Sequence, residues 1–149
     1  MTTEPSLDWW DAQLSADKRA LAFVSFAVEQ AEQLAPLLPD DPSLSDAVRA
    51  AAIESFWVNA RLLAEFLVKG TDSRDWQAND FAPGWSTTNK RAKDRLLEAW
   101  VTASRHVMHL SKDRTPDKLN AVAPATHDLY RQVAEDCRTV YDEFVANIR

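Results

Sequence analysis

Hydrophobic residues recur along most of this chain at the three- and four-residue spacing of an α-helix, and few residues interrupt the pattern. Pro36, Pro39 and Pro42 interrupt it first, because proline lacks the amide hydrogen that a helix interior needs. We therefore predict a first helix over about residues 8–35.

The next helical pattern runs without a breaker as far as Lys69. Ser43 or Ser45 stands where an N-terminal cap is expected, and Gly70 stands where a C-terminal cap is expected. Residues 70–86 then show no helical period, which predicts a long connecting loop.

Two further helices are expected after this loop. The third begins at a cap formed by Thr87 or Thr88 and ends at about Ser111. The fourth begins near Pro124 and runs almost to the end of the chain. Four helices of similar length, joined in order, predict a single domain over residues 1–149, an all-α antiparallel four-helix bundle.

The apolar face of each helix gives its predicted core residues. Leu62 and Phe66 fall outside the main face of the second helix, which predicts that this helix is covered on a second side by the loop or by another subunit. The predicted core faces of the second, third and fourth helices are Ile53, Phe56, Trp57, Ala60, Leu63, Ala64 and Leu67; Leu97, Trp100, Val101, Ser104, Val107 and Met108; and Leu129, Val133, Cys137, Val140 and Phe144.

Composition agrees with a helical protein and narrows its class. Two glycines in 149 residues are too few for the turns of a sheet protein, and 46% hydrophobic residues exclude a disordered chain. No run of 18 apolar residues and no signal-peptide pattern occurs, so we expect a soluble, cytoplasmic protein without a membrane partner. Cys137 is the one cysteine, which excludes an intrachain disulfide.

Charge is spread unevenly around a net value of −6. Residues 1–48 hold nine acidic and two basic residues (−7), whereas residues 86–118 hold eight basic and four acidic residues (+4). The basic group is expected to form a solvated face; docking on the acidic first helix of a second copy and contact with a nucleic-acid backbone are the alternatives. Its main members are Lys90, Arg91, Lys93, Arg95, Arg105, Lys112 and Arg114.

Polar residues line the margin of the second and third helices. If these helices pack side by side, Arg61 and Glu65 meet Arg105 and His109, and we predict direct or one-water hydrogen bonds between the two pairs. The cluster is either a buried structural network or a small site in which His109 is an acid or base and the arginines hold a phosphate. No metal site is expected, because His106 and His109 lack a third ligand on their helix face.

The loop between the second and third helices carries three large rings, Trp76, Phe81 and Trp85. Because such rings bury large apolar areas, we expect them either to fold back over the end of the bundle or to form a ligand or partner surface. The part of the loop over residues 80–85 is also expected to cover some of the polar cluster.

Three short segments within residues 55–115 resemble a family of small bacterial all-helical proteins whose function is unassigned. The resemblance implies a helical fold and no particular activity. The segments are the run from Ala60 through Arg61, Glu65 and Phe66 to Leu67, the pair Asp80-Phe81 followed by Trp85, and the run from His109 through Leu110 and Ser111 to Arg114.

The third helix also resembles the site of HEPN domains, all-α bundles that include RNA-cleaving toxins. In that family an arginine, a polar residue and a histidine share one helix, and here Arg105-His106 is followed by His109. The spacing between Arg105 and His109 is shorter than the family pattern.

These observations leave two hypotheses. The first is a self-associating bundle without catalysis or cofactor, which binds a partner protein or small ligand through residues of the loop, the second helix and the end of the third: Arg61, Glu65, Trp76, Phe81, Trp85 and Arg114.

The alternative is a HEPN-like, metal-independent ribonuclease of a defence or toxin–antitoxin system, with RNA as its partner. In it Arg105 would hold the scissile phosphate, His109 would take the proton of the 2′-hydroxyl group, and His106 would assist.

Overall fold

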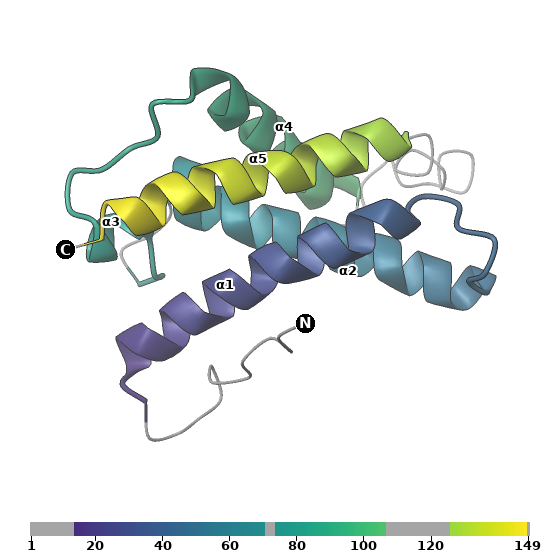
Figure 1. The fold of residues 1–149 in the computed structure, drawn as a ribbon, viewed down its shortest axis with the longest axis horizontal. Helices are drawn as coiled ribbons and strands as arrows, with labels where there is room; N and C mark the ends of the chain where they lie inside the picture. Colours follow the sequence, from purple (N-terminus) through teal and green to yellow (C-terminus); the bar gives the residue numbers. More distant parts are fainter. Residues whose placement is uncertain (1–13, 71–73, 107–125, 149) are drawn as a thin grey trace.

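A computed structural model describes residues 14–70, 74–106 and 126–148 as an antiparallel four-helix bundle (Figure 1). Successive long helices run in opposite directions, and each packs against two neighbours in the order α1, α2, α4, α5 and back to α1. The predicted all-α fold is confirmed. The elements are α1 (Ala16–Leu34), a 3₁₀ turn (Ala35–Leu37), α2 (Asp46–Ala64), a π-helical turn (Glu65–Lys69), α3 (Ala78–Phe81), α4 (Lys90–His106) and α5 (His127–Ala146).

The ends of α1 and α2 follow the capping residues of the sequence. Pro36 lies in the 3₁₀ turn that ends α1, while residues 8–13 of the predicted first helix lie outside the described residues. Ser45 caps α2, because its hydroxyl group accepts a hydrogen bond from the amide of Val48 at 3.3 Å. Gly70 ends this helix with φ of +70°, a backbone conformation that favours glycine.

The last turn of α2 departs from the predicted regular helix. The amide of Gly70 bonds to the carbonyl of Glu65, five residues earlier, at 3.0 Å. This π-helical geometry fits an additional residue into the turn between Glu65 and Lys69. Hydrophobic periodicity gave no sign of it.

The cap of α4 differs from the prediction of Thr87 or Thr88. Asn89 is the cap, since its side-chain oxygen accepts from the amide of Ala92 at 3.0 Å. Both threonines instead bind the carboxylate of Glu143 on α5, with Thr87 Oγ1 at 2.6 Å and the Thr88 amide at 2.8 Å. The predicted end of this helix, Ser111, lies outside the described residues.

Helix α5 buries the face that its sequence predicts, with one shift at its start. Thr126 caps it by accepting from the amide of Leu129, and the predicted start at Pro124 lies outside the described residues. Leu129 is exposed, and Tyr130 is buried in its place against Phe56, with ring centroids 4.9 Å apart. Val133, Cys137, Val140 and Phe144 are buried as predicted.

Cys137 lies in the middle of this buried face with no exposed surface. Burial raises the pKa of its thiol to about 12, and the charges of Asp136 and Glu32 act in the same direction. The side chain is therefore a neutral thiol that packs as a small hydrophobic group.

The predicted core face of α4 was wrong by about one residue. Val101 is 45% exposed, and Leu97, Trp100 and Ser104 lie half-buried at the margin. Alanines let neighbouring backbones approach closely, so the face that enters the core is the one with the smallest side chains. Its buried residues are Ala92, Leu96, Ala99 and Ala103; Val107 and Met108 lie outside the described residues.

The aromatic loop folds back over the end of the bundle, as one of the two predictions stated. Phe81, at the end of α3, packs against Phe66 and Phe144 with ring centroids 6.0 and 6.4 Å apart, and Trp85 lies 5.5 Å from Phe144. Figure 1 shows α3 beside the C-terminal end of α5. Phe66, which the sequence placed outside the main face of α2, is thus covered by the chain's own loop.

Candidate functional site

The polar margins of α2 and α4 meet in one group of side chains, the Trp100 cluster, formed by Arg61, Glu65, Trp100 and Ser104. Glu65 Oε1 accepts from Trp100 Nε1 at 2.8 Å and from Arg61 Nη2 at 3.2 Å. Arg61 Nε donates to Ser104 Oγ at 3.0 Å. Each helix therefore satisfies polar groups of the other, as expected for a partly buried polar network.

Two cations lie close to the ring of Trp100. The guanidinium carbon of Arg61 is 5.7 Å from the ring centroid, and the ammonium nitrogen of Lys69 is 4.4 Å from it. Contacts of this kind contribute about 0.5–1 kcal/mol at exposed sites. Lys69 is the last residue of the π-helical turn, so this turn contributes to the cluster along with the last turn of α2, which carries Arg61.

The polar margins of the two helices meet, as predicted. The α4 residues with described contacts to this margin of α2 are Trp100 and Ser104. Trp100 and Ser104 bind the Arg61–Glu65 pair, and Arg105 is exposed at the next position. The side chain of His106, together with His109 and Arg114, lies outside the described residues. A contact between the pair and Arg105 or His109 stays a prediction.

The predicted cover over this cluster by residues 80–85 also stays a prediction. The described ring contacts of Phe81 and Trp85 place this part of the loop against Phe66 and Phe144. The ring within the cluster is that of Trp100.

A groove opens beside the cluster, between the first half of α1, the end of α2 and the start of the loop. We call it the Trp76 groove; its volume is about 580 Å³. Trp76 stands at this groove with 49% of its surface exposed, 5.3 Å from the ring of Phe81. Glu65 lines the groove and so belongs to both sites. The lining residues are Ala16, Arg19, Ala20, Phe23, Val24, Leu62, Glu65, Phe66, Asp75 and Trp76.

The lining of the Trp76 groove is mostly apolar, with three charged residues. Sites that hold small molecules typically have volumes of about 300–1,000 Å³ and a few polar groups in an apolar wall. Arg19 supplies a positive charge, while Glu65 and Asp75 supply negative charges. Among the described residues, no group of three or more histidine, cysteine, aspartate or glutamate side chains is placed to hold a metal ion.

An ion pair with a buried carboxylate lies on the other side of α4, whereas the sequence predicts a solvated basic face for Arg95. Arg95 binds Asp136 of α5 with both ends of its guanidinium, Nε to Oδ2 at 2.7 Å and Nη2 to Oδ1 at 2.6 Å. Asp136 is only 4% exposed. The hydrogen bonds to Asp136 raise the pKa of Arg95, so this guanidinium stays charged.

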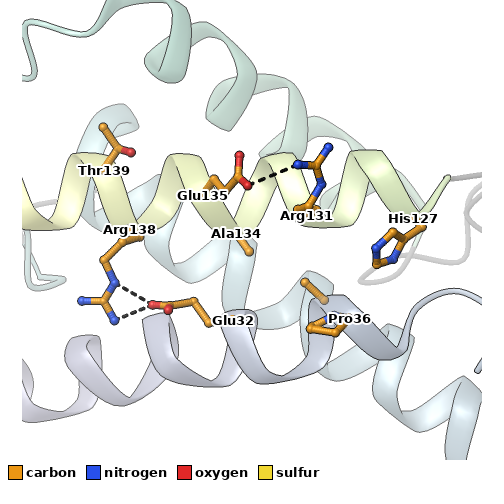
Figure 2. A pocket seen from close by; sticks show the side chains of 9 residues that line it. Glu32, Pro36, His127, Arg131, Ala134, Glu135, Arg138 and Thr139 are labelled. Carbon is orange, nitrogen blue, oxygen red and sulfur yellow. Dashed lines mark hydrogen bonds and ion pairs between the residues drawn. The ribbon is translucent and has the colours of Figure 1, made fainter.

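A second hollow, the α1–α5 trough, lies between the end of α1 and one face of α5, with a volume of about 360 Å³ (Figure 2). Glu32 and Arg138 form an ion pair toward one end, while Pro36 and His127 lie at the other. The sequence held a signal for this site, since His127, Arg131 and Arg138 follow helical spacing on α5. The lining residues are Glu32, Ala35, Pro36, His127, Arg131, Ala134, Glu135, Arg138 and Thr139.

Comparison with family models, curated proteins and solved structures finds no match to this chain. The resemblances drawn from short sequence segments therefore stay predictions. Within the described residues, no helix is both long and apolar enough to cross a membrane.

Proposed function

We propose that this chain is a non-catalytic binding protein that self-associates through the Trp76 groove. The observation that carries the proposal is the half-exposed ring of Trp76 beside an apolar hollow. A large ring at such a position is typical of a binding surface, because burying it stabilises a complex substantially.

A second copy of the chain fits this surface because the groove is complementary to itself. Under a twofold axis each patch contacts its own equivalent, so Trp76 of one copy enters the hollow beside Trp76 of the other. The same axis brings Arg19 of one copy toward Asp75 of the other, which pairs opposite charges twice. A surface with a ring, a hollow and both signs of charge meets these requirements together.

The expected association is weak. Because Trp76 is already half-buried in one copy, two such rings bury only about 150–250 Å² more on association. A stable interface buries about 1,200–2,000 Å² in total, so most of the contact area comes from the flanks of α1 and the loop. We expect dimers at micromolar rather than nanomolar concentration.

Sedimentation velocity of the full chain across the micromolar range tests the proposal. The wild type is expected to shift from monomer to dimer, and Trp76→Ser to stay monomeric over the same range. Val101→Ser is the matched control, because Val101 is 45% exposed and lies on α4, outside the groove. A wild type that is monomeric at every concentration would contradict self-association.

A charge exchange tests the twofold geometry itself. Arg19→Asp and Asp75→Arg each place like charges together in the dimer and should each weaken it. The double variant restores two opposite pairs and should recover much of the association. Failure of the double variant to recover, with both single variants folded, would show that Arg19 and Asp75 do not meet.

The ribonuclease alternative uses residues whose side chains mostly lie outside the described part of the chain, so the described geometry adds no support to it. Incubation of total RNA with purified protein distinguishes the two functions. The non-catalytic proposal expects no difference between wild type and His109→Ala. Degradation that His109→Ala abolishes would favour the ribonuclease.

A further inference from the structure

We propose that the α1–α5 trough binds a small monocarboxylate with an apolar body. This site is separate from the Trp76 groove and does not depend on self-association. The buried residues Ala35 and Ala134 form the floor. The rim carries arginine and glutamate side chains (Figure 2). An apolar floor beside an arginine with exposed ion-pair partners fits a molecule with an uncharged ring or chain and one anionic end.

The size of the trough limits the ligand. Its volume of about 360 Å³ lies at the lower end of the range for small-molecule sites. The pair formed by Glu32 and Arg138 bounds one end, and His127 stands at the other. His127 Nδ1 lies 3.1 Å from the carbonyl oxygen of Leu38, which can only accept a hydrogen bond, so this nitrogen is the donor and the ring is held in place.

Arg131 is the residue that we assign to the carboxylate. Its guanidinium is directed toward Glu135 at 3.6 Å and also lies 3.3 Å from Asp128. The partner side chains are 64% and 82% exposed, and pairs of this kind contribute about 0–1 kcal/mol. Arg131 therefore exchanges these partners for the carboxylate of a ligand at little cost, by a change of rotamer.

Arg138, by contrast, is part of the wall. It binds Glu32 through Nε at 2.6 Å and through Nη2, and binds Asp142 at 3.4 Å. Replacing Glu32 would break the bonds that hold α1 to α5 at this point. The two arginines of the trough thus have different roles, one structural and one available to a ligand.

The charge around the trough selects a carboxylate over a phosphate. Four carboxylates lie on or beside the rim, those of Glu32, Asp128, Glu135 and Asp142. A dianion meets more repulsion from them than a monoanion does, whereas the planar fork of arginine matches a carboxylate with two parallel hydrogen bonds.

Nuclear magnetic resonance titration of the full chain tests this proposal with four probes. Phenylacetate carries both the ring and the charge, 2-phenylethanol carries the ring alone, and acetate and inorganic phosphate carry charge alone. Phenylacetate should shift the amide signals of Ala35 and Ala134 saturably. Each of the other three probes should bind more weakly, by a factor of at least about ten. Equal binding of phenylacetate and 2-phenylethanol would overturn the role of charge, and no binding of phenylacetate would overturn the site.

Arg131→Gln is the decisive variant. It should remove the preference for phenylacetate over 2-phenylethanol while leaving the remaining amide signals in place, which shows that the fold is retained. Arg91→Gln is the matched control, since Arg91 is exposed on α4 and does not line the trough. Unchanged phenylacetate affinity in Arg131→Gln would overturn the assignment of the carboxylate to Arg131.

Discussion

Helix α4 contacts an arginine–carboxylate pair on each side. The Arg95–Asp136 pair joins α4 to α5, whereas the Arg61–Glu65 pair lies at the end of α2 and bonds to Trp100 and Ser104 of α4. Toward α2, the carboxylate of Glu65 is 29% exposed and receives Arg61 and the indole of Trp100. Toward α5, the carboxylate of Asp136 is almost fully buried and receives both ends of Arg95. The two arginines are equally exposed, at 27% and 28% of their side chains, so the pairs differ in the burial of the carboxylate.

From this difference we expect burial of the carboxylate, rather than the number of hydrogen bonds, to decide how much each pair contributes to stability. A carboxylate at the edge can replace a lost partner with water. A buried carboxylate cannot, so removing its partner leaves an uncompensated charge in an apolar environment. The pair that joins α4 to α5 should therefore be the more sensitive of the two.

The largest effect is expected from Arg95→Met, which leaves Asp136 buried without its cation. Breaking a buried pair from one side costs about 3–5 kcal/mol, measured here as the free energy of unfolding in urea. Arg91→Met, at an exposed position on the same helix, should change stability by less than about 0.5 kcal/mol.

A double variant, Arg95→Met with Asp136→Leu, sharpens this test. Replacing both charges by apolar groups should recover most of the lost stability, because no buried charge remains. If Arg95→Met alone cost no more than Arg91→Met, the argument from burial would be wrong.

A smaller effect is expected at the Trp100 cluster. Arg61→Ala and Glu65→Ala should each lower the free energy of unfolding by about 1–3 kcal/mol, since each leaves a partly buried group without a partner. Their double variant should fall short of the sum, as expected for two residues in one network. Strict additivity in urea unfolding would show that they act independently. Glu98→Ala, exposed on α4, is the control.

The smallest effect on stability is expected from the hydrogen bonds between Glu143 and the two threonines before α4. Burial alone would raise the pKa of Glu143, but the hydrogen bonds from Thr87 and Thr88 outweigh it, so its pKa lies below the ordinary value of 4.5. A lowered pKa in the folded state gives stability that is present above the pKa of the unfolded state and is lost as pH falls through the folded value.

The corresponding measurement compares unfolding of wild type and Glu143→Gln between neutral pH and about pH 3. The wild type should be the more stable protein at neutral pH. The difference in free energy of unfolding between the two proteins should become smaller as the pH falls below 4.5. Glu135→Gln, on the exposed side of the same helix, is the control for the loss of one negative charge. A difference in free energy of unfolding that stays constant with pH would show that the charge of Glu143 does not contribute to stability.

The sequence predicted those parts of the fold that depend on local spacing. The four-helix order and the cap at Ser45, one of two candidates, follow from neighbours along the chain. The packing of Phe81 over the bundle end was predicted from its apolar area.

The remaining features depend on residues far apart in the sequence. Asp136 lies 41 residues after Arg95, and no local pattern joins them. The predicted core face of α4 was wrong because alanine side chains are less hydrophobic than those of Trp100 and Val101. The alanines are nevertheless the residues that fit the narrow space between the helices. The Trp76 groove needed Arg19 of α1 beside the loop, which only the three-dimensional arrangement supplies.

The buried thiol of Cys137 can be used to measure local opening of the folded protein. Because the sequence contains no second cysteine, any thiol-specific reagent has one target, and that target has no exposed surface in the folded protein. Labelling at Cys137 must therefore wait until α5 separates from its neighbours. When separation and return are fast compared with labelling, the rate measures the free energy of that local opening without denaturant. The labelling rate of Cys137 thus reports local opening at the centre of the core.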